Sequence, residues 1–275
     1  MHSGIIVDTW VKRAELMNKL FLISGPCVVE NETTPRLIAK EVKAICDSLD
    51  IDYIFKASYR KANRTKEDSF MGIGDEIALQ IIQSVGKEFG VRTLTDIHES
   101  KEAALVSQYV DVLQIPAFLC RQTELLHAAG KTGKTVNIKK GQFVSPEAMK
   151  FPVQKVKATG NNNVWLCERG FTFGYEDLVV DVTTIPRLKK HGVPVVMDCT
   201  HSVQAPNKES GVSGGNPQFI ETMARYAAVT EADGLFIETH PDPKHALSDS
   251  STMLQLERLQ GILEKVVSIR KAVMA

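Results

Sequence analysis

Short apolar runs rich in β-branched residues recur along the chain, and each is followed by polar residues and then by a longer stretch of mixed character. Eight such runs begin 20 to 40 residues apart, at 21–29, 53–58, 91–97, 111–118, 135–141, 164–170, 194–202 and 234–240. This spacing leaves room for a crossover helix after each run, as parallel strands require. Apolar residues recur at intervals of three and four, which predicts helices, over 34–49, 74–89, 217–231 and 254–273.

Eight strands with eight crossovers predict an α/β fold, a (β/α)8 TIM barrel that forms one domain over residues 1–275. A doubly wound open sheet is the alternative. That fold usually carries a GxGxxG turn after its first strand, and this chain has none. Because the first twenty residues precede the first strand, we expect a short N-terminal extension that closes the bottom of the barrel.

The composition narrows the classes of partner. The 33 basic residues balance 33 acidic residues, whereas a general nucleic-acid binder usually carries a basic excess. We expect no membrane partner, because no apolar run approaches the roughly 20 residues that span a bilayer. The five cysteines are widely spaced and odd in number, and the N-terminus makes a poor signal peptide, so we expect a reduced cytoplasmic location.

All eight predicted strands end in polar or charged residues. In a (β/α)8 barrel these carboxyl ends form the working face. Charged side chains are seldom buried without partners, so a ring of them predicts a charged ligand. The cations at these ends would suit small phosphates and carboxylates, and they are Lys56, Lys61, Arg64, Arg121, Lys139 and Arg169. The alternative is that some of the cations at this face form structural ion pairs, Lys140 above all.

A second group of strand-end residues could bind a divalent transition metal. Cys27, His201, Glu238 and Asp249 are all permitted ligands. The first, seventh and eighth strands are neighbours in a closed barrel, so three of the four can meet. Taken alone, Cys27 could equally be a small core residue and His201 a hydrogen-bonded core histidine. Spacing does not select these four from the other cysteines and acids.

Nine blocks of sequence together resemble one family, the 3-deoxy-D-manno-octulosonate-8-phosphate synthases. In order they are GPCVVE (25–30), FKASYRKANRT (55–65), TDIHE (95–99), QIPAFLCRQTEL (114–125), NIKKGQF (137–143), CERGFTFGY (167–175), DCTHSVQ (198–204), SGG (213–215) and ETHPDPKHALSDSS (238–251). The most specific is KANR at 61–64. The related synthase that makes a seven-carbon sugar acid carries a KPRT-like block there.

The resemblance implies a (β/α)8 barrel that assembles as a homotetramer. It also implies the condensation of phosphoenolpyruvate with D-arabinose 5-phosphate and water. The products would be 3-deoxy-D-manno-octulosonate 8-phosphate and inorganic phosphate, in lipopolysaccharide biosynthesis. Two other functions stay open: a synthase that uses erythrose 4-phosphate, and a non-catalytic barrel that binds phosphosugars.

The family has a metal-dependent and a metal-free branch, and two positions resemble the former. The metal-free branch places Asn where this chain has Cys27, and it tends to follow Asp249 with Gly-Pro rather than Ser250-Ser251. The resemblance therefore implies one divalent ion per subunit, Zn, Fe or Mn, held by Cys27, His201, Glu238 and Asp249. A metal-free synthase with Cys27 as a filler is the alternative.

The resemblance also implies roles for residues around the substrates. Lys139 and Arg169 resemble the clamp on the phosphate of phosphoenolpyruvate, a role that suits a point charge and a planar fork. Lys56, Ser58 and Lys61 lie where the family holds the carboxylate and the aldehyde end. The residues implied in catalysis itself are Lys61, Lys139, His201 and Asp249.

The pentose phosphate has its own implied residues. Asn63, Arg64 and Thr65 resemble the clamp on its phosphate, with Thr65 in place of the Ser that is common there. Asp96 and His98 would face the sugar hydroxyls. The remaining implied substrate-binding residues are Gln114, Pro116, Ala117, Arg121 and Gln204.

Overall fold

Parallel strands form a closed barrel in the computed structural model, which describes residues 19–63, 69–174, 177–205 and 214–275. The eight barrel strands in this described part are β1 (Phe21–Gly25), β2 (Asp52–Lys56), β3 (Arg92–Asp96), β4 (Val112–Ile115), β5 (Thr135–Lys139), β6 (Val164–Glu168), β7 (Val195–Asp198) and β10 (Gly234–His240). Each strand pairs with the next, and β10 pairs with β1 to close the barrel. The predicted (β/α)8 barrel is confirmed, and the open-sheet alternative is wrong.

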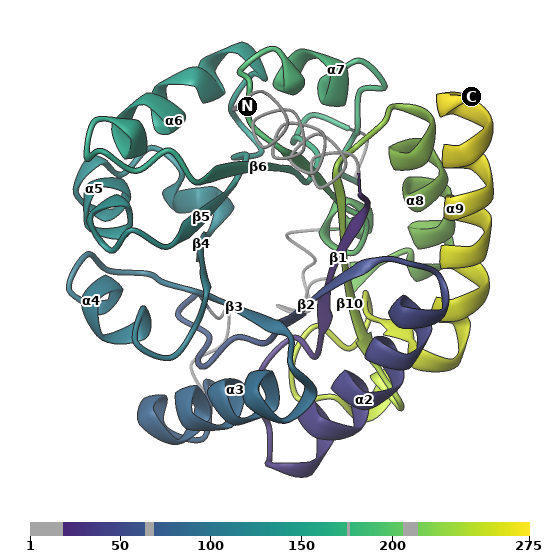
Figure 1. Cartoon of the computed structure of the whole chain (residues 1–275), viewed down its shortest axis with the longest axis horizontal. Coiled ribbons are helices and arrows are strands. Elements are labelled where there is room, and N and C mark those ends of the chain that lie inside the picture. Colours follow the sequence, from purple (N-terminus) through teal and green to yellow (C-terminus); the bar gives the residue numbers. More distant parts are fainter. Residues whose placement is uncertain (1–18, 64–68, 175–176, 206–213) are drawn as a thin grey trace, which may run out of the picture.

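Helices surround the strands as an outer ring (Figure 1). They are α2 (Thr33–Ser48), α3 (Asp75–Phe89), α4 (Glu102–Val106), α5 (Thr123–Lys131), α6 (Lys150–Lys157), α7 (Thr184–Lys189), α8 (Ile220–Val229) and α9 (Leu259–Met274). Short 3-10 turns and strands complete the described chain: η1 (Ala117–Leu119), η2 (Glu147–Met149), η3 (His201–Val203), β8 (Gln204–Ala205), β9 (Gly214–Gly215), η4 (Pro217–Phe219), η5 (Pro243–His245), β11 (Leu254–Gln255) and η6 (Leu256–Arg258).

Helix α2 illustrates how the sequence determines these elements. The side chain of Asn31 accepts hydrogen bonds from the backbone N–H groups of Thr33 (2.9 Å) and Thr34 (2.8 Å), which satisfies two donors that the first turn leaves free. Ile38, Val42 and Cys46 then recur on one face and are buried against the barrel. The predicted helix over 34–49 is confirmed to within one residue.

The last predicted helix starts later than its apolar pattern suggests. Residues 254–255 form β11, which pairs with β10, and the hydroxyl of Thr239 donates to the carbonyl of Leu254 at 2.9 Å. Tertiary pairing therefore overrides helix propensity at this point. The consequence is functional, because β11 fixes the end of the loop that carries Asp249.

Alternation along the strands separates an apolar layer from a polar layer inside the barrel. A small inner core contains Ile54, Leu94, Val112, Val196 and Phe236, among others. Successive inward side chains are two residues apart in a strand. Two positions after these five residues come, respectively, the buried polar side chains Lys56, Asp96, Gln114, Asp198 and Glu238. The polar layer therefore lies directly above the inner core, at the carboxyl ends of the strands.

Among residues 19–63, 69–174, 177–205 and 214–275, no helix combines the length and the apolar character that a bilayer crossing needs. All five cysteines are free and buried. The expected N-terminal extension falls almost entirely outside the described residues, so it stays a prediction.

Candidate functional site

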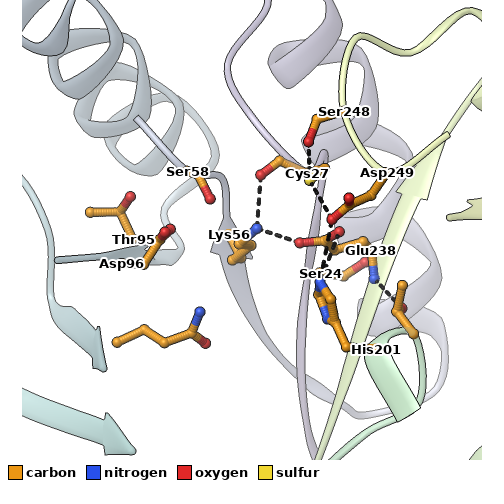
Figure 2. Close-up of polar contacts among 12 residues, drawn as sticks. Ser24, Cys27, Lys56, Ser58, Thr95, Asp96, His201, Glu238, Ser248 and Asp249 are labelled. Atoms are coloured by element: carbon orange, nitrogen blue, oxygen red, sulfur yellow. Dashed lines mark hydrogen bonds and ion pairs between the residues drawn. The ribbon is translucent and has the colours of Figure 1, made fainter. Parts of the chain in front are cut away.

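The carboxyl ends of β1, β2, β7 and β10 bring together Cys27, Lys56, His201 and Glu238, and Figure 2 shows the contacts of Lys56 with both Cys27 and Glu238. The strands approach closely here. A Cβ atom on Gly25 would overlap the carbonyl oxygen of Lys56, so this position requires glycine. The backbone then leads from Gly25 to Cys27 at the mouth of the barrel.

The four predicted metal ligands meet at this mouth. The thiol of Cys27 lies 3.2 Å from Asp249 Oδ2, and ligand atoms of Cys27, Glu238 and Asp249 all lie within 4.8 Å of one another. His201 Nε2 is 3.5 Å from Glu238 Oε2 and 3.7 Å from Asp249 Oδ2. A sulfur, a nitrogen and carboxylate oxygens from distant parts of the chain thus surround one small volume.

The donor atoms fit a divalent metal on two independent grounds. Glu238 is 1% exposed, yet its Oε2 has no hydrogen-bond partner within the described part of the chain, whereas buried polar atoms are normally paired. His201 presents Nε2 to the carboxylates while its Nδ1 lies 2.9 Å from Asp198 Oδ2. A carboxylate on the second ring nitrogen is the usual arrangement behind a metal-bound histidine.

The surroundings of Cys27 disfavour the charged form of its thiol, which a nearby cation would stabilise. Burial, together with the charges of Asp249 and Glu238, raises the pKa of the Cys27 thiol. Ser248 Oγ accepts a contact from the same sulfur at 3.0 Å. A bound metal ion would compensate the charge of the thiolate, so metal binding would release the thiol proton.

Asp249 holds an uncommon backbone conformation. Its φ is 47°, in the left-handed region that a few per cent of non-glycine residues adopt, Asn and Asp most often. Its carbonyl accepts from the N–H of Thr252 at 3.0 Å, which fixes the turn. The conformation directs the carboxylate towards Cys27, and such outliers cluster at functional sites.

Lys139, at the end of β5, lies beside the candidate metal ligands. Its ammonium donates to Asp198 Oδ2 at 2.7 Å and lies 3.3 Å from His201 Nδ1 and 3.9 Å from the centre of the Phe236 ring. Asp198 is fully buried, so one carboxylate compensates a lysine and orients a histidine. The strand-end cation and the candidate metal centre share this carboxylate.

Arg169 offers an unused donor group. It is 6% exposed, its Nη2 donates to Gln204 Oε1 at 2.7 Å, and its Nη1 has no hydrogen-bond partner among the described residues. A buried guanidinium N–H without a partner is costly. The arrangement therefore suits an anionic ligand at this position.

Lys56 is paired more tightly than the sequence predicts. Its ammonium contacts Glu238 Oε1 and donates to the carbonyl of Cys27 at 2.9 Å, and the side chain is 2% exposed. Lys61 donates to Ser58 Oγ at 3.0 Å. Lys56 thus contacts two of the candidate metal ligands, Cys27 and Glu238, directly.

The two substrate clamps differ in how much of them is described. Asn63 is exposed, and Arg64 and Thr65 lie outside the described residues, so the clamp on the sugar phosphate stays a prediction.

Ala117 begins η1 directly after Pro116, and Arg121 is exposed on the loop that follows η1 rather than buried with the other cations.

Two buried polar pairs lie further round the barrel. Gln114 Oε1 accepts from Asn137 Nδ2 at 3.1 Å. Lys140 is 1% exposed and pairs with Glu168 Oε1 at 3.5 Å. The interpretation of Lys140 as structural is confirmed.

Asp96 and His98 form a third group, which includes a residue that the sequence analysis missed. His98 Nε2 lies 3.0 Å from Asp96 Oδ2, and His98 Nδ1 lies 3.5 Å from Glu102 Oε2. Burial alone would lower the pKa of His98, but the two carboxylates outweigh it and raise the pKa to about 9. The signal for Glu102 was its place four residues after His98, at the start of α4.

Comparisons with known proteins identify the family. The model of the DAHP synthetase I family matches residues 16–275. A protein of Koribacter versatilis (strain Ellin345) named 2-dehydro-3-deoxyphosphooctonate aldolase is 50% identical, over 93% of this chain and 92% of the relative. A protein with the same name from Cyanothece sp. (strain PCC 7425 / ATCC 29141) is 49% identical, over 91% of this chain and 92% of the relative. Another from Agrobacterium fabrum (strain C58 / ATCC 33970) is 48% identical, over 90% of this chain and 88% of the relative.

Proposed function

Since the chain belongs to the DAHP synthetase I family, and within it to the 2-dehydro-3-deoxyphosphooctonate aldolases, we propose that it is a 3-deoxy-D-manno-octulosonate-8-phosphate synthase. It is a transferase that condenses phosphoenolpyruvate with D-arabinose 5-phosphate and water. The products are 3-deoxy-D-manno-octulosonate 8-phosphate and inorganic phosphate. The observation that carries the proposal is the buried polar layer, in which Arg169 Nη1 and Glu238 Oε2 have no hydrogen-bond partner among the described residues.

The seven-carbon alternative is weaker. The family is described as DAHP synthetase I, but relatives that are 46–50% identical carry the octonate name. The KANR block at 61–64 favours the same acceptor. A non-catalytic barrel would have no need for buried ligands of metal type beside the anion site.

We propose that Cys27, His201, Glu238 and Asp249 hold one divalent ion, Zn, Fe or Mn. Donor atoms of Cys27, Glu238 and Asp249 lie within 4.8 Å of one another, and His201 Nε2 lies 3.5 Å from Glu238 Oε2, which has no hydrogen-bond partner among the described residues. When bound, the ion supplies a Lewis acid next to the acceptor site. Lys56 compensates Glu238, and Asp198 orients His201 through Nδ1.

The protein groups position the two reactants. Lys139 and Arg169 hold the phosphate of phosphoenolpyruvate, Gln204 orients Arg169, and Lys61 with Ser58 holds the aldehyde end. Holding both reactants in register contributes on the order of 7 kcal/mol to lowering the barrier. Gln114, Pro116 and Ala117 line the phosphoenolpyruvate side.

The bond changes balance within this site. Carbon 3 of phosphoenolpyruvate attacks the aldehyde carbon, and the aldehyde oxygen takes up a proton. Water adds to carbon 2 and gives up a proton, which forms a hemiketal phosphate. The C–O bond to phosphate then breaks, and inorganic phosphate leaves as the carbonyl forms.

We further propose that residues 1–275 fold as one barrel domain, since β1 and β10, near opposite ends of the chain, pair directly. The enzyme works in the cytoplasm as a homotetramer and supplies lipopolysaccharide biosynthesis. The five buried free cysteines support a reducing location.

Phosphate release from phosphoenolpyruvate tests the reaction, with D-arabinose 5-phosphate and erythrose 4-phosphate compared as acceptors. We expect release with the pentose phosphate, loss of release after a strong chelator, and recovery with added Zn, Fe or Mn. Release that survives complete metal removal would keep the synthase and overturn the metal proposal. Preference for erythrose 4-phosphate would establish the seven-carbon reaction instead.

A further inference from the structure

Glu102 connects two loops that reach the mouth of the barrel. It begins α4, is 9% exposed, and uses its two carboxylate oxygens separately. Oε1 contacts Arg60 Nη2, on the loop after β2. Oε2 accepts the backbone N–H of His98 at 2.7 Å, on the loop after β3. Neither the strand pattern nor the family resemblance assigns a role to Glu102.

One branch of this contact leads to Asp96. Glu102 Oε2 lies 3.5 Å from His98 Nδ1, and His98 Nε2 lies 3.0 Å from Asp96 Oδ2, so the imidazole is held between two carboxylates. Of the two carboxylate oxygens of Asp96, Oδ2 contacts His98. Its Oδ1 is buried without a hydrogen-bond partner among the described residues, which leaves an acceptor for a ligand hydroxyl.

The other branch leads to Lys61. Arg60 lies between Glu102 and Asp75, and Arg60 Nη1 is 3.4 Å from Asp75 Oδ2. The Arg60 guanidinium also lies over the Tyr59 ring, 5.7 Å from its centre. Lys61 follows directly, with its N–H bonded to the carbonyl of Met71 at 2.8 Å. A fixed Arg60 therefore fixes the start of the segment that carries Lys61.

We infer that Glu102 is a positioning residue that couples the loop bearing Asp96 and His98 to the loop bearing Lys61, and so sets the distance across the acceptor-sugar site. The inference rests on the proposed function, because it assigns the coupled loops to the sugar phosphate rather than to phosphoenolpyruvate. Charge-assisted hydrogen bonds are the stronger ones, which makes one carboxylate sufficient for the coupling.

Steady-state kinetics of Glu102→Gln test the coupling. The amide keeps the shape and the bond to the His98 N–H but loses both charge contacts. We expect the KM for D-arabinose 5-phosphate to rise roughly tenfold, the loss typical of one charged hydrogen bond, and the KM for phosphoenolpyruvate to stay within about twofold. An equal rise in both constants, or no rise in either, would overturn the inference.

Glu99→Gln is the matched control. Glu99 lies three residues earlier, is exposed, and pairs with Lys101 at 2.7 Å. The KM values of Glu99→Gln for D-arabinose 5-phosphate and for phosphoenolpyruvate should both equal those of the wild type. A change as large as that of Glu102→Gln would show a general effect of charge near α4 and overturn the specific role.

A double-variant comparison separates coupling from two independent effects. Arg60→Gln alone should raise the same KM, and Arg60→Gln combined with Glu102→Gln should raise it no further than the larger single change. If the double variant instead shows the product of the two single effects, the two loops are not coupled through this contact.

A titration without substrates keeps the inference distinct from the proposed reaction. In histidine proton NMR, with the signal assigned by loss in His98→Gln, Glu102→Gln should lower the pKa of His98 by roughly one unit or more. The groups facing the ring are Asp96, Glu102 and the Tyr59 ring at 6.1 Å, with Arg60 behind Glu102. An unchanged titration would overturn the positioning role, whichever sugar phosphate the enzyme uses.

Discussion

Glu238 and His201 face each other inside the barrel mouth, with Glu238 Oε2 3.5 Å from His201 Nε2. Both groups have their other polar atom occupied, Glu238 Oε1 by Lys56 and His201 Nδ1 by Asp198. The two atoms that remain point at the same volume as the Cys27 thiol and Asp249 Oδ2. This relationship, rather than any single residue, makes the group a candidate metal centre.

Cys27→Asn should lower metal retention and leave the barrel folded. The substitution removes the sulfur from a set in which Glu238 and Asp249 remain. After dialysis against a weak chelator, metal content by elemental analysis should fall by roughly tenfold or more per subunit, with unchanged far-ultraviolet circular dichroism. Cys46→Ala is the control, since Cys46 is buried in the apolar core outside this site. Equal metal content in Cys27→Asn and the wild type would remove Cys27 from the centre.

Asp198→Asn should destabilise the fold more than a typical substitution. Its carboxylate compensates the buried Lys139 and holds His201, and loss of one partner of a buried pair leaves an uncompensated charge. We expect a loss of about 3 kcal/mol in the free energy of unfolding, measured with urea. Replacing Lys139 with Met in the same variant should restore part of it.

The exposed pair between Arg187 and Glu147 provides the comparison for Asp198. Glu147→Gln removes a contact of 2.6 Å at the surface, where screening makes ion pairs weak. Its unfolding midpoint should stay close to that of the wild type. If Asp198→Asn behaved like this surface variant, the lysine would have another compensating partner.

The barrel was predictable because its strands and helices leave separate periodic signals. Buried strands read as short β-branched runs, and the alternation within them also places Lys56, Asp96 and Glu238 on the inner face. The resemblance added the candidate ligands Cys27, His201, Glu238 and Asp249, whose side chains lie near one another in the structure while their binding of a metal stays a prediction. Short-range pattern and family motifs were sufficient for these features.

Contacts between loops were not predictable in the same way. Nothing in the sequence pairs Ser248 with Cys27, or Arg60 with Glu102, because the loops after different strands meet only once the barrel closes. The pairing of Lys56 with Glu238 was missed for the same reason. Charge alone also suggested that Arg121 converges with the other cations, whereas it lies exposed. Its contact with phosphoenolpyruvate stays a prediction.

Arg64→Ala should weaken the sugar phosphate selectively. The expectation comes from the KANR block, since Arg64 lies outside the described residues. Loss of a guanidinium from a phosphate clamp removes a charge-assisted contact. The KM for D-arabinose 5-phosphate should rise by at least about tenfold, while the KM for phosphoenolpyruvate changes little. An equal effect on both substrates would sink the assignment.

His98 should make stability depend on pH above neutrality. Its pKa is raised from 6.5 to about 9 in the folded protein, so the protonated ring stabilises the fold. This contribution is fully present below pH 6.5, the value for the unfolded chain, and is lost as pH rises through about 9. The difference between these two pKa values corresponds to roughly 3 kcal/mol in the free energy of unfolding.

Urea unfolding of the wild type and His98→Gln at pH 6 and pH 9.5 measures this term. At pH 6, His98→Gln should have a smaller free energy of unfolding than the wild type. Most of this difference between the two proteins should disappear at pH 9.5. Subtracting the variant removes the other titrating groups, including the cysteines. A difference that stays constant with pH would mean that the carboxylates of Asp96 and Glu102 do not hold a charged imidazole, and the role of Glu102 would fail with it.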